Sequence, residues 1–175
     1  MANNKTILIA DDNTDILTAL KYCLEGTFSH IITLERPDEL LKTMAQEQVD
    51  IVLLDMNFQP GVNSGQEGLL WLRTLRKHHP QTPVVLLTAY ADVQLAVRGL
   101  KSGAADFIVK PWDNDELVAK LREVLSLSNE VATLDQMEAA HIRRAIDQCH
   151  GNLSRAAEML GITRQTLYNK MKRLS

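Results

Sequence analysis

The feature that most constrains this fold is an unbroken apolar run, Ile51 to Leu54, which ends in one carboxylate at Asp55. A run of this length, bounded by turn residues and apolar on both faces, is typical of a strand in a parallel sheet that helices cover on both sides. Ligands of such sheets bind beyond the carboxyl ends of the strands, so Asp55 is placed where chemistry would occur. Asp is also common in turns, so a turn role for Asp55 stays open on this evidence alone.

Apolar runs and helical patterns alternate along the first 127 residues. We expect strands at 6–10, 30–34, 51–55, 83–88 and 106–110. Apolar residues at helical spacing predict helices at 14–24, 37–46, about 65–78, 92–101 and 113–127. This strict alternation predicts an α/β domain with a doubly wound, five-stranded parallel sheet and right-handed crossovers.

Polar side chains stand at the ends of four of these five runs. They are Asp11-Asp12, Asp55, Thr88 and Lys110. Because the carboxyl ends of parallel strands share one edge of the sheet, we expect these side chains to meet. Turn chemistry alone would not explain a lysine at the end of the last strand, directly before Pro111.

The chemistry of this set favours phosphoryl transfer. Carboxylates crowded together repel each other and are tolerated around a cation or with a shifted pKa. Oxygen ligands without His or Cys favour Mg²⁺. Lys110 and Thr88 suit a phosphoryl group, whose charge is spread over three oxygens. An aspartate carboxylate can itself act as the nucleophile that accepts the group.

These residues, in this order on alternating strands, resemble the receiver domain of two-component response regulators over roughly residues 5–127. The resemblance implies a flavodoxin-like domain at 1–127, bound Mg²⁺ and phosphorylation by a partner sensor histidine kinase. It implies Asp55 as phospho-acceptor, a metal site of Asp11, Asp12, Asp55 and the backbone carbonyl of Asn57, phosphoryl contacts from Thr88 and Lys110, and a switch of Thr88 and Phe107. Asp12 would bind the ion directly and Asp11 through water. Core packing is the alternative for Phe107.

One segment departs from the family pattern. The loop after Asp55, residues 58–68, is longer than the usual one. Its glycines, Gly61, Gly65 and Gly68, fit neither the dinucleotide pattern nor the Lys-bearing phosphate loop. We therefore expect a flap over the site rather than a nucleotide-binding loop.

The remaining chain differs in charge from the first part. From His141 onward there are seven Arg or Lys against two acidic residues, a net charge of +5, so the total of −3 leaves −8 on residues 1–140. A basic module on an acidic body predicts a polyanion partner for the tail. We expect a linker at 128–134, then helices at 134–149, 154–160 and 163–174. Short helices joined by a glycine-containing turn are typical of a helix-turn-helix.

The stretch from Asn152 to Lys172 resembles the Fis-type helix-turn-helix, within a small all-α domain at 135–175. That resemblance implies a homodimer and double-stranded DNA as partner, with two half-sites about one DNA turn apart. By position, the residues facing bases would be Arg164, Gln165, Thr166 and Asn169, and those touching the backbone Ser154, Arg155, Lys170 and Lys172. A solvated face of a helical hairpin is the plainer alternative.

The two motif sets together predict a transcription regulator in which phosphorylation of Asp55 switches dimerisation and sequence-specific DNA binding. We expect only self-phosphorylation and dephosphorylation, not enzymatic action on another substrate. One alternative is a small-molecule phosphatase or phosphotransferase with a dimerising tail, which would need a second acid/base carboxylate where Asn57 stands. Another is a protein-interaction adaptor, whose binding would depend little on salt.

A receiver followed by this tail also resembles the bacterial enhancer-binding activators, which carry an ATPase domain between the two. No Lys-bearing phosphate loop is present in this sequence. A natural short form and a form with the ATPase deleted both stay open. Without an apolar run near 18 residues or a leader sequence, we expect a cytoplasmic protein with no membrane segment.

Overall fold

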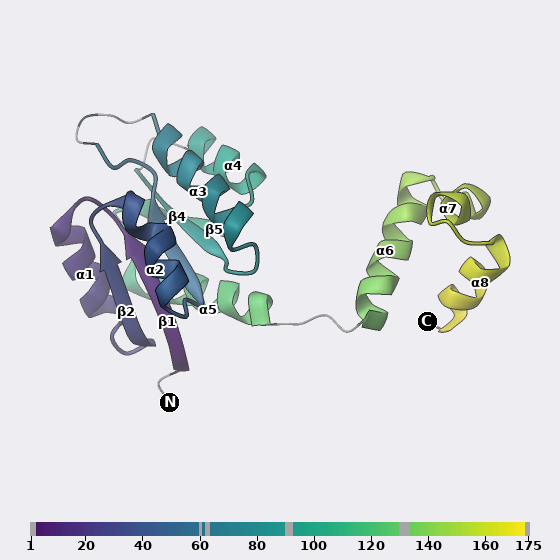
Figure 1. Cartoon of the computed structure of the whole chain (residues 1–175), viewed down its shortest axis with the longest axis horizontal. Coiled ribbons are helices and arrows are strands. Elements are labelled where there is room, and N and C mark those ends of the chain that lie inside the picture. Colours follow the sequence, from purple (N-terminus) through teal and green to yellow (C-terminus); the bar gives the residue numbers. More distant parts are fainter. Residues whose placement is uncertain (1–2, 60, 62–63, 90–92, 130–133, 174–175) are drawn as a thin grey trace. The chain divides into compact units, whose positions relative to one another are not determined.

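A computed structural model describes residues 3–59, 61, 64–89, 93–129 and 134–173. The chain divides into two compact units, Met1–Asn129 and Glu130–Ser175 (Figure 1). Residues 130–133, within the predicted linker, lie outside the described residues. The structure places residues 128 and 129, which are predicted as part of the linker, in a helix.

The first unit contains one sheet of five parallel strands. They are β1 (Asn3–Ala10), β2 (Phe28–Leu34), β3 (Ile51–Asp55), β4 (Val84–Ala89) and β5 (Asp106–Lys110). Their order in the sheet is β2-β1-β3-β4-β5, which is the flavodoxin-like order. The predicted doubly wound parallel sheet is therefore confirmed.

Helices cover both faces of this sheet. They are α1 (Thr14–Leu24), α2 (Leu40–Gln46), α3 (Gln66–His78), α4 (Val93–Lys101) and α5 (Asn114–Asn129). One core lies between the sheet and α1 and α5, and the other between the sheet and α2, α3 and α4. Successive strand residues point to opposite faces, so Ile7 and Ile9 enter the first core and Leu8 enters the second.

Strand β3 is the centre of the unit. All five of its residues are buried, and it pairs with β1 on one side and β4 on the other. The register sets Ile51 beside Ile7 and Val52 beside Val84. Because strands flank β3 on both sides and helices cover both of its faces, no residue of this segment needs to be polar.

One predicted helix begins differently. The segment 37–46 starts as a 3₁₀ turn at Pro37–Glu39, and α2 begins only at Leu40. Pro37 has no N–H and suits the first turn of a helix, so the helical segment begins at Pro37 as predicted. Its first turn, however, has 3₁₀ hydrogen bonds and not α-helical ones. Leu40 and Met44 carry the buried face of this short helix.

Gly68 allows α3 to pack directly on the end of β3. Its amide donates to the Met56 carbonyl at 3.1 Å, and a Cβ at this position would lie 2.5 Å from the Met56 Cα. We expect Gly68→Ala to lower the free energy of unfolding of this unit by about 1–3 kcal/mol, because backbone must move. Urea unfolding followed by tryptophan fluorescence measures this unit alone, since Trp71 and Trp112 are the only tryptophans.

The matched control for Gly68→Ala is Gly26→Ala. No atom lies within 4 Å of a Cβ built at Gly26. We expect this change to alter the free energy of unfolding by less than about 0.5 kcal/mol. Equal effects of the two substitutions would show that the contact with Met56 is not what restricts position 68.

The second unit is a three-helix domain of α6 (Leu134–Gln148), α7 (Leu153–Met159) and α8 (Arg164–Arg173). Gly151 and Gly161 adopt positive φ angles at the two turns, 81° and 67°. The Asn152 side chain accepts from the Arg155 amide and caps α7, and the Thr163 hydroxyl accepts from the Thr166 amide at the start of α8. These caps and turns fix the helix-turn-helix geometry.

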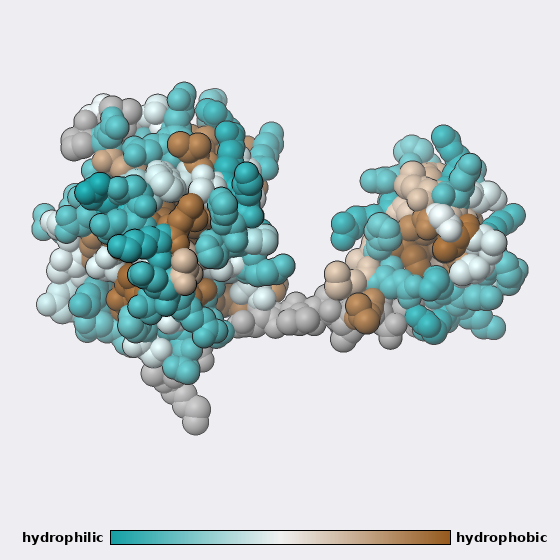
Figure 2. Space-filling model, viewed as in Figure 1, coloured by the Kyte–Doolittle hydropathy of each residue, from teal (hydrophilic) through white to brown (hydrophobic). Residues whose placement is uncertain are grey.

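The core of this unit is small and apolar. It consists of Ile142, Ala145, Cys149, Ala156, Ala157 and Leu167. Large apolar side chains stay exposed around it, among them Leu134 and Met137 on α6, and Figure 2 shows hydrophobic areas beside the hydrophilic surface of the unit. Among the helices that the structure describes, none has both the length and the apolar character needed to cross a membrane.

Candidate functional site

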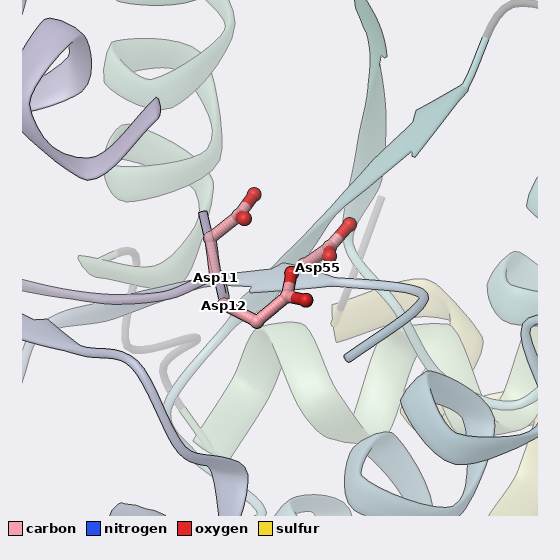
Figure 3. Close-up of side chains that lie close together, drawn as sticks. All are labelled: Asp11, Asp12 and Asp55. Atoms are coloured by element: carbon pink, nitrogen blue, oxygen red, sulfur yellow. The ribbon is translucent and has the colours of Figure 1, made fainter. Parts of the chain in front are cut away.

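Three carboxylates meet at the carboxyl edge of the sheet. Asp11 and Asp12 follow β1, and Asp55 is the last residue of β3 (Figure 3). One oxygen from each lies within 4.8 Å of the others. Asp11 is 0 % exposed and Asp55 5 % exposed, whereas Asp12 is half-buried. The β1–β3 pairing therefore brings the predicted acidic residues together.

Lys110, at the end of β5, completes this cluster. Its Nζ donates to Asp11 Oδ2 at 2.7 Å and to Asp55 Oδ1 at 3.0 Å. The β4–β5 register sets Ala89 beside Lys110, so two parallel strands bring the lysine to the edge where β3 ends. The prediction that separate strand ends meet at one point is confirmed for these residues.

The two oxygens of Asp55 have different surroundings. Oδ1 accepts hydrogen bonds from the Met56 amide at 2.9 Å and from Lys110. Within the part of the chain that the structure describes, no hydrogen bond is made to Oδ2. Asp11, by contrast, uses both oxygens, accepting from the Asn13 amide and from Lys110. Asp55 is thus oriented by one oxygen and offers the other to a ligand.

Burial and like charge shift the titration of this cluster. Burial first, and then the charge of Asp11, raise the pKa of Asp55 from 3.8 to about 6, although Lys110 opposes the shift. Burial lowers the pKa of Lys110, but its hydrogen bond to Asp11 and the nearby carboxylates outweigh this, so the net shift is upward. The lysine therefore stays charged, and its ammonium group is shared by Asp11 and Asp55.

This shift makes the stability of the first unit depend on pH when metal is absent. Between pH 3.8 and about 6 the folded state holds a proton on Asp55 that the unfolded state has released, so stability falls as pH rises through this window. Relative to wild type, we expect Asp55→Asn to gain up to about 3 kcal/mol of unfolding free energy between pH 4 and pH 7. Urea unfolding in EDTA, followed by tryptophan fluorescence, measures this difference.

The control for this titration is Asp38→Asn. Asp38 is an exposed carboxylate that pairs with Arg36 and is not a member of the acidic cluster. A gain that Asp38→Asn matched over the same pH range would not come from the cluster. If the Asp55→Asn difference did not change with pH, the folded-state pKa of Asp55 would not be raised.

The donor chemistry of the cluster suits a hard divalent cation. The oxygens come from carboxylates, and neither His nor Cys belongs to the described cluster. Carboxylate oxygens with room for water are the ligands that Mg²⁺ prefers. Asp11, Asp12 and Asp55 could therefore hold such an ion, and its charge would relieve the repulsion among them. The backbone carbonyl of Asn57 stays a prediction as a further ligand.

The other residues predicted for this site are nearby but have different contacts. Thr88 is buried in β4, and its recorded hydrogen bond runs to its neighbour Ala89, at 3.5 Å. Phe107 is half-buried and packs against the α2–α3–α4 core, with the Lys120 Nζ 5.2 Å from its ring centroid. Phe107 thus packs against the core in this structure, as the alternative predicted, and a switching role stays a prediction.

The long loop after Asp55 is held at its far end. The Asn57 side chain accepts from the Gly65 amide at 2.7 Å, and Gly65 has a φ of 64°. A Cβ on Gly65 would lie 1.9 Å from Leu95. Residues 60, 62 and 63 lie outside the described residues, and with them the predicted flap.

Helix α8 presents a polar face to solvent. Among the residues predicted to contact nucleic acid, six are exposed: Ser154, Arg155, Arg164, Gln165, Asn169 and Lys172. The Gln165 amide donates to Asn169 Oδ1 at 3.2 Å, so these two side chains lie together. Two predicted contacts are placed elsewhere. Thr166 is half-buried at the helix cap, and Lys170 pairs with Glu138 of α6.

Sequence reasoning left Tyr168 out of this face. Its side chain is exposed on the same side of α8 as Arg164 and Lys172, which precede and follow it by four residues. The i, i+4 spacing was the available signal. An aromatic residue adds apolar contact area to a face that otherwise offers hydrogen-bond donors and charge.

Comparisons with known proteins agree with this geometry. The family described as response regulator receiver domain matches residues 7–122, and that described as bacterial regulatory protein, Fis family, matches residues 133–174. The chain is similar to the crystal structure of the N-terminal signal receiver domain of a two-component system response regulator from Bacteroides fragilis, with 46 % identity and a TM-score of 0.64, over 70 % of this chain and 98 % of that one.

Two curated relatives show the extent of the similarity. The DNA-binding transcriptional regulator NtrC of Salmonella typhimurium is 32 % identical over 120 residues, which is 69 % of this chain and 24 % of NtrC. The regulatory protein AtoC of Escherichia coli is 34 % identical over 135 residues, 74 % of this chain and 28 % of AtoC. The chain thus spans about a quarter of the length of the curated relatives it matches.

Proposed function

Because this chain belongs to the response regulator family, we propose that it is a two-component response regulator whose phosphorylation at Asp55 controls DNA binding and transcription. The first unit would accept the phosphoryl group from a sensor histidine kinase, and the second, which matches the Fis family, would bind double-stranded DNA. Self-phosphorylation and dephosphorylation would be its only chemistry. A DNA partner implies that it acts in the cytoplasm.

The observation that carries the proposal is the arrangement around Asp55. Oδ1 is held by the Met56 amide and Lys110, which leaves Oδ2 to attack phosphorus. In the proposed transfer, Oδ2 forms a bond to phosphorus while the bond from phosphorus to the donor nitrogen breaks, and the donor imidazole leaves with that electron pair. Burial raises the pKa of Asp55 only to about 6, so the carboxylate is still mainly ionised at neutral pH, as a nucleophile requires.

Lys110 and the neighbouring carboxylates would complete the reaction site. The lysine is already within 3.0 Å of Asp55 and would place its charge beside the incoming phosphoryl oxygens. Asp11, Asp12, Asp55 and the carbonyl of Asn57 would hold Mg²⁺, which when bound supplies the positive charge that a phosphoryl group needs. The hydroxyl of Thr88, on the adjacent strand, would donate a hydrogen bond to a phosphoryl oxygen.

The output would come from the second unit. Arg164, Gln165 and Asn169 would face the bases, while Arg155 and Lys172 would contact phosphates. Exposed Leu134 and Met137, three residues apart on α6, support a homodimer through this helix. Phosphorylation, read through Thr88 and Phe107, would change dimerisation and so the spacing of two recognition helices.

The proposal predicts two activities in one chain. Incubation with acetyl phosphate and Mg²⁺ should add the mass of one phosphoryl group, and EDTA should prevent it. Fluorescence anisotropy should show binding to duplex DNA that weakens steeply as salt rises. A chain that hydrolysed phosphate esters with turnover and did not bind DNA would be an enzyme of another class, and binding that ignores salt would indicate a protein partner.

A further inference from the structure

The carboxylate of Glu138, on α6, holds two basic residues of the recognition helix. Its Oε1 accepts from the Lys170 Nζ, and its Oε2 accepts from an Arg173 guanidinium nitrogen at 2.8 Å. The two cations are separated from Glu138 by more than thirty positions in sequence, so the contact ties the last turn of α8 to α6. Nothing in the proposed phosphorylation or base contacts uses this cluster.

The side of α8 on which Lys170 lies explains the pairing. Leu167 is fully buried and Met171 packs against the same core, so the side that contains these two residues faces α6 and α7. Lys170 lies three residues after Leu167 and one before Met171, at the border of this inner side. Lys172 lies on the exposed side instead. Two lysines of one helical turn therefore have different surroundings.

The cluster contains one carboxylate and two cations, so a net positive charge remains. The hydrogen bond from Lys170, with the charges of Lys170 and Arg173, holds the pKa of Glu138 below its usual range, so the carboxylate stays ionised. Side-chain exposure is 29 % for Glu138 and 32 % for Lys170, against 62 % for Arg173. Lys170 is thus the more enclosed of the two cations, and its charge is already paired with that of Glu138.

We propose that Glu138 withholds Lys170 from the DNA backbone and lowers the charge that the end of α8 presents to it. This inference rests on the proposed DNA binding. It means that Lys170 positions α8 and does not bind phosphate, while Lys172 on the same turn does. Weaker general attraction to phosphates leaves a larger share of the binding free energy to base contacts by Arg164, Gln165 and Asn169.

Salt dependence separates positioning from phosphate contact. The logarithm of the DNA affinity falls with the logarithm of the salt concentration, with a slope of about −0.9 for each phosphate that the protein neutralises. We would measure this slope by fluorescence anisotropy, using the full chain and a labelled duplex of mixed sequence. The variants are Lys170→Gln, Lys172→Gln, Glu138→Gln and the double variant Glu138→Gln/Lys170→Gln. A purely structural role of the cluster would change affinity without changing the slope.

We expect Lys170→Gln to keep the wild-type slope and Lys172→Gln to lose about 0.9 of it, because only the second lysine reaches a phosphate. Glu138→Gln should bind more tightly at low salt with a steeper slope. In the double variant Glu138→Gln/Lys170→Gln, the slope should be less steep than in Glu138→Gln by about 0.9. Circular dichroism would check that each variant keeps its helices. Even if Glu138→Gln unfolds, a slope that Lys170→Gln lowers as much as Lys172→Gln does would overturn the inference.

Two results would overturn the inference while the proposed function stands. One is a slope that Lys170→Gln lowers as much as Lys172→Gln does, which would place Lys170 on a phosphate in spite of Glu138. The other is a slope that Glu138→Gln does not change in a folded protein. Absence of salt-dependent DNA binding in the wild-type chain would instead reject the DNA-binding function, and this inference with it.

Discussion

Asp55→Asn should take up no phosphoryl group from acetyl phosphate in the presence of Mg²⁺, whereas wild type should gain the mass of one. An amide is a poor nucleophile, so the substitution removes the carboxylate whose Oδ1 is held by hydrogen bonds and whose Oδ2 is offered to a ligand. The shape of the site should survive, since Asn can still accept from the Met56 amide and from Lys110 at the position of Oδ1. Intact-protein mass spectrometry measures the loss, and hydroxylamine should release the group from wild type as expected for an acyl phosphate.

The controls for this experiment are two carboxylates outside the reaction path. Asp38→Asn, at an exposed ion pair with Arg36, should be labelled like wild type. Asp106→Asn is a stricter control, because Asp106 lies at the start of β5, the strand that ends in Lys110. Labelling of Asp55→Asn to the wild-type extent would mean that another residue accepts the group, and the site would have to be reassigned.

The sequence was sufficient to predict the sheet and the position of the acidic cluster. Burial on both faces of β3 follows from its unbroken apolar run, and parallel strands leave their carboxyl ends on one edge. Once the strands are assigned, Asp11, Asp55 and Lys110 must therefore come together. The topology brings Lys110 and Asp11 together, while the distance of 2.7 Å between Nζ and Oδ2 depends on the conformations of the two side chains.

The contacts of individual side chains were less predictable. A list of donors on α8 does not say on which side of the helix each lies. Lys170, which is predicted to touch the DNA backbone, pairs with Glu138 in this structure. The spacing of Leu167 and Met171 indicates which side of α8 faces inward. It does not indicate that Glu138, more than thirty residues earlier in the sequence, pairs with Lys170. Thr166 is predicted by its position to face bases, and in this structure its hydroxyl lies 2.8 Å from the hydroxyl of the capping residue Thr163.

The second large effect expected is loss of DNA binding in Leu167→Ala with phosphorylation intact. Leu167 is 0 % exposed and is the largest residue that α8 places in the core of the second unit. Replacing a buried leucine by alanine costs about 2–5 kcal/mol. A domain this small rarely has more than about 3–5 kcal/mol of stability, so the change should unfold much of the population.

The two units should respond separately to this substitution, because they have separate cores. Hydrogen exchange followed by mass spectrometry should show lost protection in peptides from 134–173 and unchanged protection in β1 to β5. Acetyl phosphate should still label Asp55, and anisotropy should detect no duplex binding. Met159→Ala is the matched control, since Met159 is 56 % exposed and should tolerate truncation. If Leu167→Ala also abolished labelling, the acceptor site would depend on the second unit, and a chain made of two independently stable modules would be the wrong description.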